Sequence, residues 1–127
     1  MLLSFLFKTK KANPTEELPT AVDYVEWLLK HMLQTSRMEL TIDTQRALPG
    51  SDKSSQTEPP PCLPDTQSVI NRLKILSGIN PVNQAKGISG AFARPRKNHN
   101  IEVSTQFQDS VKNSICVIRL RIRGLNI

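Results

Sequence analysis

The stretch Ile115-Cys116-Val117-Ile118-Arg119-Leu120-Arg121-Ile122-Arg123 is the most regular part of this 127-residue sequence. From Ile118 onward, apolar residues and arginines alternate one for one, so every second side chain shares a face. A period of two is typical of a β-strand with one buried face. Residues 101–107 alternate in the same way, and we expect the two stretches to pair as a hairpin within 99–127. An isolated hairpin is marginal in water, so this one needs something to pack on.

Two further segments have the spacing of amphipathic α-helices. Over 20–37, apolar residues recur every three or four positions, and over 65–78 a shorter apolar stripe is bounded by Asp65 or Thr66 and by Gly78. These patterns predict two short helices, the second ending at a glycine suited to a C-cap. We interpret the apolar face of the first helix as a surface for a helix partner whose identity the sequence does not give. That face consists of Val22, Val25, Leu28, Leu29, Met32 and Leu33.

The composition predicts a largely disordered chain with little core. Hydrophobic residues make up 38% of the sequence, six residues are aromatic and nine are proline. Globular domains usually contain about 45–50% apolar residues, in a count that includes glycine. We interpret 1–19 as an apolar and basic tail, 38–64 as a Ser/Thr/Pro-rich linker and 79–98 as a basic loop. The predicted fold class is therefore a marginal α+β chain of two helices and a C-terminal hairpin.

The linker contains a peptide that resembles the short motif bound by the small dimeric dynein light chain. Clients of that light chain typically show Lys, any residue, Thr, Gln and Thr, often after Asp. This sequence keeps the Lys, the Gln and the second Thr, and Ser55 stands in place of the first Thr. The resemblance covers seven of 127 residues and implies binding by Asp52, Lys53, Ser54, Ser55, Gln56, Thr57 and Glu58.

The resemblance implies that the peptide binds by adding a strand to a sheet edge of the light chain. Main-chain hydrogen bonds then give a sequence-neutral part of the affinity, and alternate side chains enter pockets. Gln56 and Thr57 are the expected specific anchors. A phosphate on Ser55 or Thr57 adds charge inside such a groove, so we expect phosphorylation there to weaken binding.

Charge is distributed unevenly along the sequence. Residues 1–60 carry seven Lys/Arg against eight Asp/Glu, whereas residues 61–127 carry ten against three. An alternative function is therefore a basic accessory protein, from a virus or a splice form, that binds nucleic acid or an anionic membrane through its C-terminal half. The candidate basic residues are Arg94, Arg96, Lys97, Arg119, Arg121 and Arg123. A solvated loop and a charged edge strand are the simpler interpretations of the same residues.

The sequence shows no arrangement typical of an enzyme. Its two histidines, His31 and His99, stand in no recognisable catalytic motif, and two distant cysteines make no metal site. We therefore expect a non-enzymatic protein without cofactor or metal, in the cytoplasm or nucleus rather than secreted. The apolar start at 1–7 is either a packed end or a weak interfacial anchor, because the lysines follow it instead of preceding it.

Overall fold

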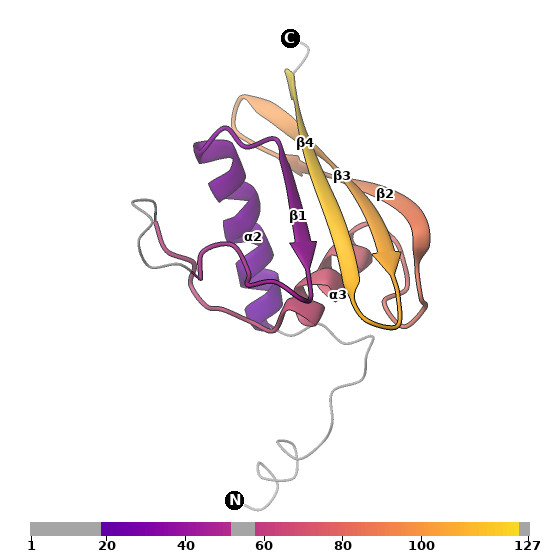
Figure 1. Ribbon diagram of the computed structural model, residues 1–127. Helices are drawn as coiled ribbons and strands as arrows, with labels where there is room; N and C mark the ends of the chain where they lie inside the picture. The colour runs from indigo at the N-terminus through magenta and orange to yellow at the C-terminus, as the bar shows by residue number, and fades with distance from the viewer. Residues whose placement is uncertain (1–18, 52–57, 125–127) are drawn as a thin grey trace, which may run out of the picture.

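The computed structural model describes residues 19–51 and 58–124. Six elements follow one another along the chain (Figure 1). They are helix α2 (Pro19–Gln34), strand β1 (Glu39–Asp43), helix α3 (Thr66–Leu76) and strands β2 (Lys86–Pro95), β3 (His99–Asp109) and β4 (Ser114–Gly124).

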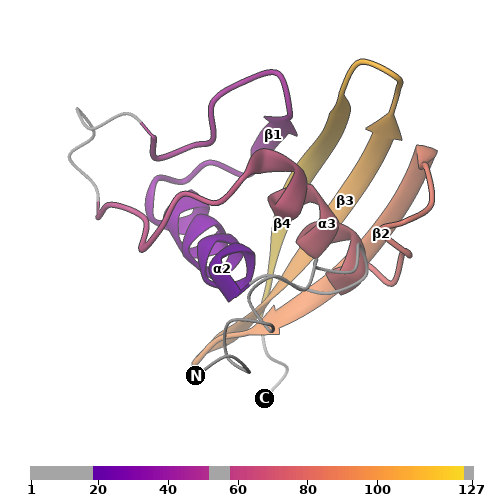
Figure 2. The ribbon, with the colours of Figure 1, turned by 90° about the horizontal axis from the view of Figure 1, so that it is seen from below.

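The four strands form one antiparallel sheet in the order β1-β4-β3-β2. Both helices lie on the same side of this sheet, as the view from below shows (Figure 2). The second face of the sheet, which we call the outer face, carries no helix from the described part of the chain. A β-bulge at Gly87 shifts the β2–β3 register between Lys86 and Ile88.

Strict alternation in β3 and β4 places one half of their side chains in the core. In β3, Ile101, Val103 and Phe107 are buried. Ser104, Gln106 and Gln108 alternate with the buried residues and are exposed. The pairs Val103–Leu120 and Phe107–Cys116 bring inward residues of both strands side by side. The helices supply the opposite layer of the core with Tyr24, Val25, Leu28, Leu29, Met32, Val69, Ile70 and Leu73.

Both helices end in the same hydrogen-bonded motif. After α3, Gly78 has φ +79°, its N–H donates to Ile75 O, and Ile79 N–H donates to Lys74 O. That pair of bonds is a Schellman C-cap, which favours glycine at the left-handed position. After α2, the equivalent left-handed position is occupied by Ser36, with φ +57°. The expected glycine cap of the second helix is therefore confirmed, and the first helix uses a serine for the same turn.

A buried ion pair fastens α3 to the end of β3. Lys74 Nζ lies 2.6 Å from Asp109 Oδ2, and both side chains are less than a tenth exposed. Asp109 Oδ2 also accepts the N–H of Ala85 at 2.7 Å. Burial alone raises the pKa of Asp109, but the hydrogen bonds from Ala85 and Lys74 outweigh it and hold that pKa below its usual value. The pair thereby ties three segments of the chain together.

The expectation of a largely disordered chain with a marginal hairpin is wrong. The two helices and the β3–β4 pairing were expected, but the range assigned to a linker, 38–64, contains β1, and the range assigned to a loop, 79–98, contains β2. The core is nevertheless continuous, because buried and partly buried apolar residues of both helices and all four strands converge on one cluster between the helices and the sheet. Overall composition therefore understated the core that these residues build.

Candidate functional site

The segment that contains the peptide motif is held at both flanks by aromatic residues of α2. The Tyr24 hydroxyl donates to Pro49 O, and Trp27 Nε1–H donates to Glu58 O at 3.1 Å. Tyr24 and Trp27 lie with ring centroids 5.5 Å apart, and His31 stacks on the other side of Trp27 at 4.7 Å. One turn of helix thus contacts the chain shortly before the motif, at Pro49, and at the last residue of the motif, Glu58.

Gly50 closes the base of this loop. Its φ is +89°, and a Cβ added there would lie 2.7 Å from Trp27 Cη2 and 3.0 Å from Pro60 Cγ. No L side chain fits that space without displacing the indole or the proline ring. Gly50, Pro60 and Trp27 are therefore in contact, and we call these three residues the loop stem.

The motif residues Asp52, Lys53, Ser54, Ser55, Gln56 and Thr57 lie outside the described residues. Glu58 is the one motif residue that the structure describes. Its side chain is exposed, and its carbonyl oxygen is the acceptor for Trp27. The 44–65 connection is further attached to α2 by Cys62, whose Sγ lies 3.2 Å from Thr20 O. This connection therefore contacts α2 at Pro49, Gly50, Glu58 and Cys62.

The apolar face of α2 packs inside the protein. Val25, Leu28, Leu29 and Met32 are at most 1% exposed, and Val22 and Leu33 are half-buried. This face contacts the sheet and α3, so it does not present a ready surface to another protein. Trp27 is also buried, and Gly50 lies against its indole ring.

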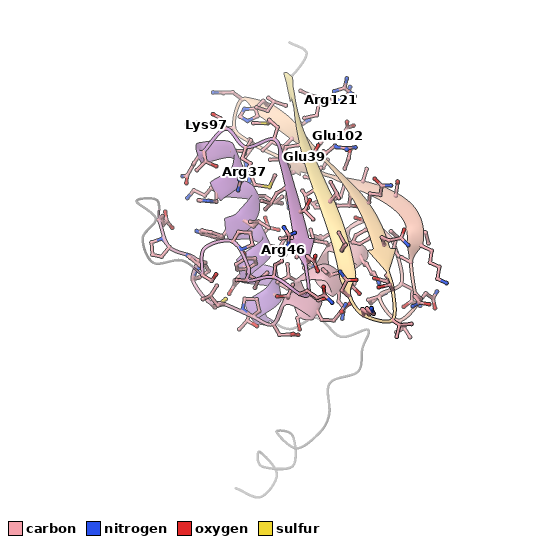
Figure 3. The ribbon with its side chains drawn as sticks, in the orientation of Figure 1. Arg37, Glu39, Arg46, Lys97, Glu102 and Arg121 are labelled. Atoms are coloured by element: carbon pink, nitrogen blue, oxygen red, sulfur yellow. The ribbon has the colours of Figure 1, made fainter. Side chains whose placement is uncertain are left out.

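The three basic residues before the β2–β3 turn lie in different surroundings. Arg94 makes a bidentate contact with Glu26 of α2, with Nη2 2.7 Å from Oε2, and its guanidinium lies 5.2 Å from the centre of the Phe92 ring. Arg96 is half-buried, and Lys97 is exposed at the turn (Figure 3). Arg94 therefore acts as a link between β2 and α2.

Arg119, Arg121 and Arg123 share the outer face of β4, as the alternation indicates, and each lies near a carboxylate of a neighbouring strand. Arg119 Nε lies 2.8 Å from Glu39 Oε1 on β1. Arg121 and Arg123 lie 3.9 and 3.5 Å from Glu102 Oε1 on β3. Figure 3 shows Arg121 beside Glu102 at the upper end of the sheet. These cross-strand pairs offset much of the positive charge of the row.

The remainder of the outer face is of mixed polarity and holds two depressions. The larger, about 340 Å³, lies between Ala91, Ala93, Glu102 and Arg123. The smaller, about 170 Å³, is lined by Ser89, Ser104, Gln106, Val117 and Arg119, among others. Hydroxyls, amides and ion-paired charges line them together with alanines, Ile101, Val117 and Phe92.

The described residues contain no cluster of three or more His, Cys, Asp or Glu side chains that could hold a metal ion. Cys116 is fully buried, and burial raises the pKa of its thiol to about 12. That thiol is therefore protonated at neutral pH and a poor nucleophile. Within 19–51 and 58–124, no helix is long and apolar enough to cross a membrane.

Comparisons of the chain with protein-family models, with curated proteins and with solved structures found no match. Of the features described here, sequence patterns missed the loop stem and the Arg94–Glu26 pair. Gly50 and Pro60 lie in the range interpreted as a linker, and nothing local indicated that Trp27 would contact this range. Glu26 and Arg94 are 68 residues apart, so no local pattern could relate them.

Proposed function

We propose that this protein is a non-enzymatic adaptor that presents residues 52–58 to a dynein light chain. The observation that carries the proposal is the resemblance of residues 52–58 to the light-chain motif, in a segment that bonds to α2 at Pro49 and at Glu58 through Tyr24 and Trp27. Binding residues are commonly placed on loops that a rigid scaffold positions. Here the scaffold is the helix-covered sheet, and the loop that it positions contains the light-chain motif.

The stem sets a geometric condition on binding. A seven-residue peptide bound as a strand spans about 20 Å between its first and last Cα atoms. Gly50 and Pro60 are in contact, and the two residue steps on each side of the motif reach at most about 7.6 Å. An extended motif would use nearly all of this length. Binding by strand addition is therefore expected to compete with the Trp27–Glu58 hydrogen bond and to loosen the stem.

Calorimetric titration of the full chain with the purified light chain tests the proposal. The double variant Gln56→Ala, Thr57→Ala should abolish measurable binding, because it removes the two side chains expected to fill pockets. The matched control is Thr41→Ala with Gln84→Ala, which removes the same residue types from exposed positions elsewhere. Equal affinities for the wild-type protein and the motif variant would refute the proposal.

A second candidate is binding of nucleic acid or an anionic membrane through the basic C-terminal half. Arg119, Arg121 and Arg123 favour it because they are exposed in one row of β4. Their pairing with Glu39 and Glu102 weakens it, since phosphate would have to displace those carboxylates. Binding of this kind should fall steeply with salt concentration. An affinity that does not change between low and high salt would exclude it.

A further inference from the structure

β2 is an edge strand with little to prevent it from pairing with another strand. In the described residues its one strand neighbour is β3, and Lys86, Gly87, Ile88, Ser89 and Ala91 are exposed. Its residues 87–93 carry no charge. The opposite edge, β1, is half as long and has an acidic residue at each end, Glu39 and Asp43. Charged residues, short length, proline and β-bulges are the usual protection of an edge. β2 is long, and its bulge at Gly87 and its proline at 95 leave residues 88–93 between them without such protection.

The backbone groups directed toward the open edge of β2 can be identified. Arg96 N–H donates to His99 O at 2.7 Å, so the pair 96–99 is hydrogen-bonded. Hydrogen-bonded pairs alternate along an antiparallel ladder. The β2–β3 register then assigns the even-numbered residues from Ile88 to Arg94 to bonds with β3. The N–H and C=O groups of Ser89, Ala91 and Ala93 are consequently directed away from β3.

We propose that this edge pairs with the same edge of a second copy of this chain. The two β2 strands run antiparallel about a two-fold axis at Ala91. In that register Ala91 faces its own copy and Ser89 faces Ala93, so all three outward residues of each strand form hydrogen-bonded pairs. The two sheets would then be continuous across the interface. A two-fold contact of this kind uses the same patch on both partners.

The side chains are compatible with this register. On the outer face the contact is made by Ser89, Ala91 and Ala93, which are small enough for close approach. On the helix-covered face Gly90 comes opposite Phe92 of the second copy, and this pair brings no clash of two side chains because glycine has none. Gly90 has no room for a side chain of its own, because a Cβ there would lie 2.6 Å from Ser77 Cβ.

Charge and strand ends also agree with the two-fold register. Arg94 comes opposite the half-exposed Ile88 of the second copy, and its charge is already bound by Glu26. The bulge at Gly87 comes opposite Pro95, which has no N–H to donate. The ladder between the two copies therefore ends with the pair Gly87–Pro95 on both sides of the two-fold axis. It stops before Lys86 of one copy would meet Arg96 of the other.

The proposed contact is small. It involves about seven residues of each copy, whereas standard interfaces use about 20–30 residues a side. Its formation should therefore depend on protein concentration, which makes sedimentation velocity of the full chain over a concentration series the suitable experiment. The wild-type protein should shift from monomer to dimer as its concentration rises.

Charge variants at Ala91 test the register. Because Ala91 meets its own copy, Ala91→Lys and Ala91→Glu each place like charges opposite one another, and each should weaken dimerisation up to about fivefold. An equimolar mixture of the two variants pairs Lys with Glu and should dimerise again. The matched control is Ser104→Lys, which adds the same charge at the neighbouring outer-face position on β3. It should dimerise like the wild type.

Three results would overturn the proposal. A wild-type protein that stays monomeric at every concentration shows that β2 does not self-associate. Dimerisation of Ala91→Lys as strong as that of the wild type places the contact elsewhere. Failure of the mixture to recover, while each variant unfolds at the wild-type temperature, excludes the Ala91 axis. None of these results depends on binding of the light chain.

Discussion

The Arg94 guanidinium of β2 holds the Glu26 carboxylate of α2, with Nη2 2.7 Å and Nε 3.1 Å from the same oxygen, Oε2. The Arg94 side chain is about four-fifths buried against the protein, and Phe92 lies beneath it. This contact connects the edge strand to the first helix across 68 residues of sequence. Arg94 therefore has a structural role, although its sequence context, Arg-Pro-Arg-Lys, indicated only a basic loop.

Arg94→Ala should lower the free energy of unfolding by about 1–2 kcal/mol, because it removes a bidentate charge-assisted contact and the packing of the side chain. Urea denaturation measures this change. The control is Arg119→Ala, whose pair with Glu39 is more than half exposed on both sides and should contribute less than about 0.5 kcal/mol. Equal losses for the two variants would contradict a special role for Arg94.

The Lys74–Asp109 pair should make stability fall with acid in a defined way. In the folded state the pKa of Asp109 is below its usual value near 3.8. The Asp109 charge therefore makes its full contribution to the free energy of unfolding above that value. The contribution disappears as pH falls through the lowered folded pKa. Asp109→Asn should cost about 3–5 kcal/mol at pH 7, because it leaves Lys74 buried without a counter-charge.

Denaturation at a series of pH values measures the difference in free energy of unfolding between wild type and Asp109→Asn. This gap should narrow below about pH 4. Comparison of the two proteins is needed because Asp43 also loses protons more readily in the folded state. The N–H of Gln45 and the amide of Asn113 lower the pKa of that carboxyl. A gap that stays constant from pH 7 to pH 3 would show that the Asp109 charge is not what stabilises this region.

Adding a glycine at the end of α2 and removing the glycine at the end of α3 should change stability in opposite directions. Ser36→Gly should raise the free energy of unfolding by about 1 kcal/mol, because glycine adopts the left-handed conformation without the penalty that serine carries. Gly78→Ala should lower it by a similar amount, since nothing lies within 4 Å of the added methyl group and only the backbone is strained. Thermal unfolding measures both, and a loss of stability in Ser36→Gly would refute this account of the turn.

The two cysteines should differ sharply in reactivity. Cys62 is partly exposed, whereas Cys116 is buried with a pKa raised to about 12. A thiol-specific reagent at pH 8 should therefore modify one thiol per folded chain and the second only after unfolding. Cys62→Ser should remove the fast reaction. Rapid modification of both thiols in the folded protein would show that the core around Cys116 opens readily.

The patterns that predicted structure correctly were local. Apolar spacing located α2 and α3, and alternation located β3 and β4, because each of these elements buries one regular face. β1 follows directly after a helix and has five residues, too few for a distinct pattern. β2 has glycine and alanine where a strand usually has branched residues, and it owes its conformation to pairing with β3.

The candidate site was predictable in part only. The resemblance at 52–58 can be read from the sequence, but its flanking contacts cannot. Trp27 is 31 residues from Glu58, and the turn at Gly50 comes between them, so the stem exists only once α2 and the loop have packed together. Sequence patterns likewise left Arg119, Arg121 and Arg123 unpaired, because their carboxylate partners lie on other strands.

Loosening the stem should strengthen binding to the light chain. Trp27→Phe keeps an aromatic ring but removes the N–H that bonds to Glu58 O. The loss of one hydrogen bond, about 1 kcal/mol, should raise the affinity of the full chain about fivefold. The isolated peptide 50–60, which has no stem to open, should bind at least as tightly. A Trp27→Phe protein that binds more weakly than the wild type would show that the stem aids binding.

The indole N–H resonance of Trp27 tests the central claim most directly. Trp27 is the one tryptophan in the sequence, and its N–H bonds to the last residue of the motif. Titration of the ¹⁵N-labelled chain with the light chain should shift this resonance toward that of a solvated indole, in step with calorimetric binding. An indole resonance that does not move at saturating light chain would contradict the claim that residues 52–58 bind as a strand.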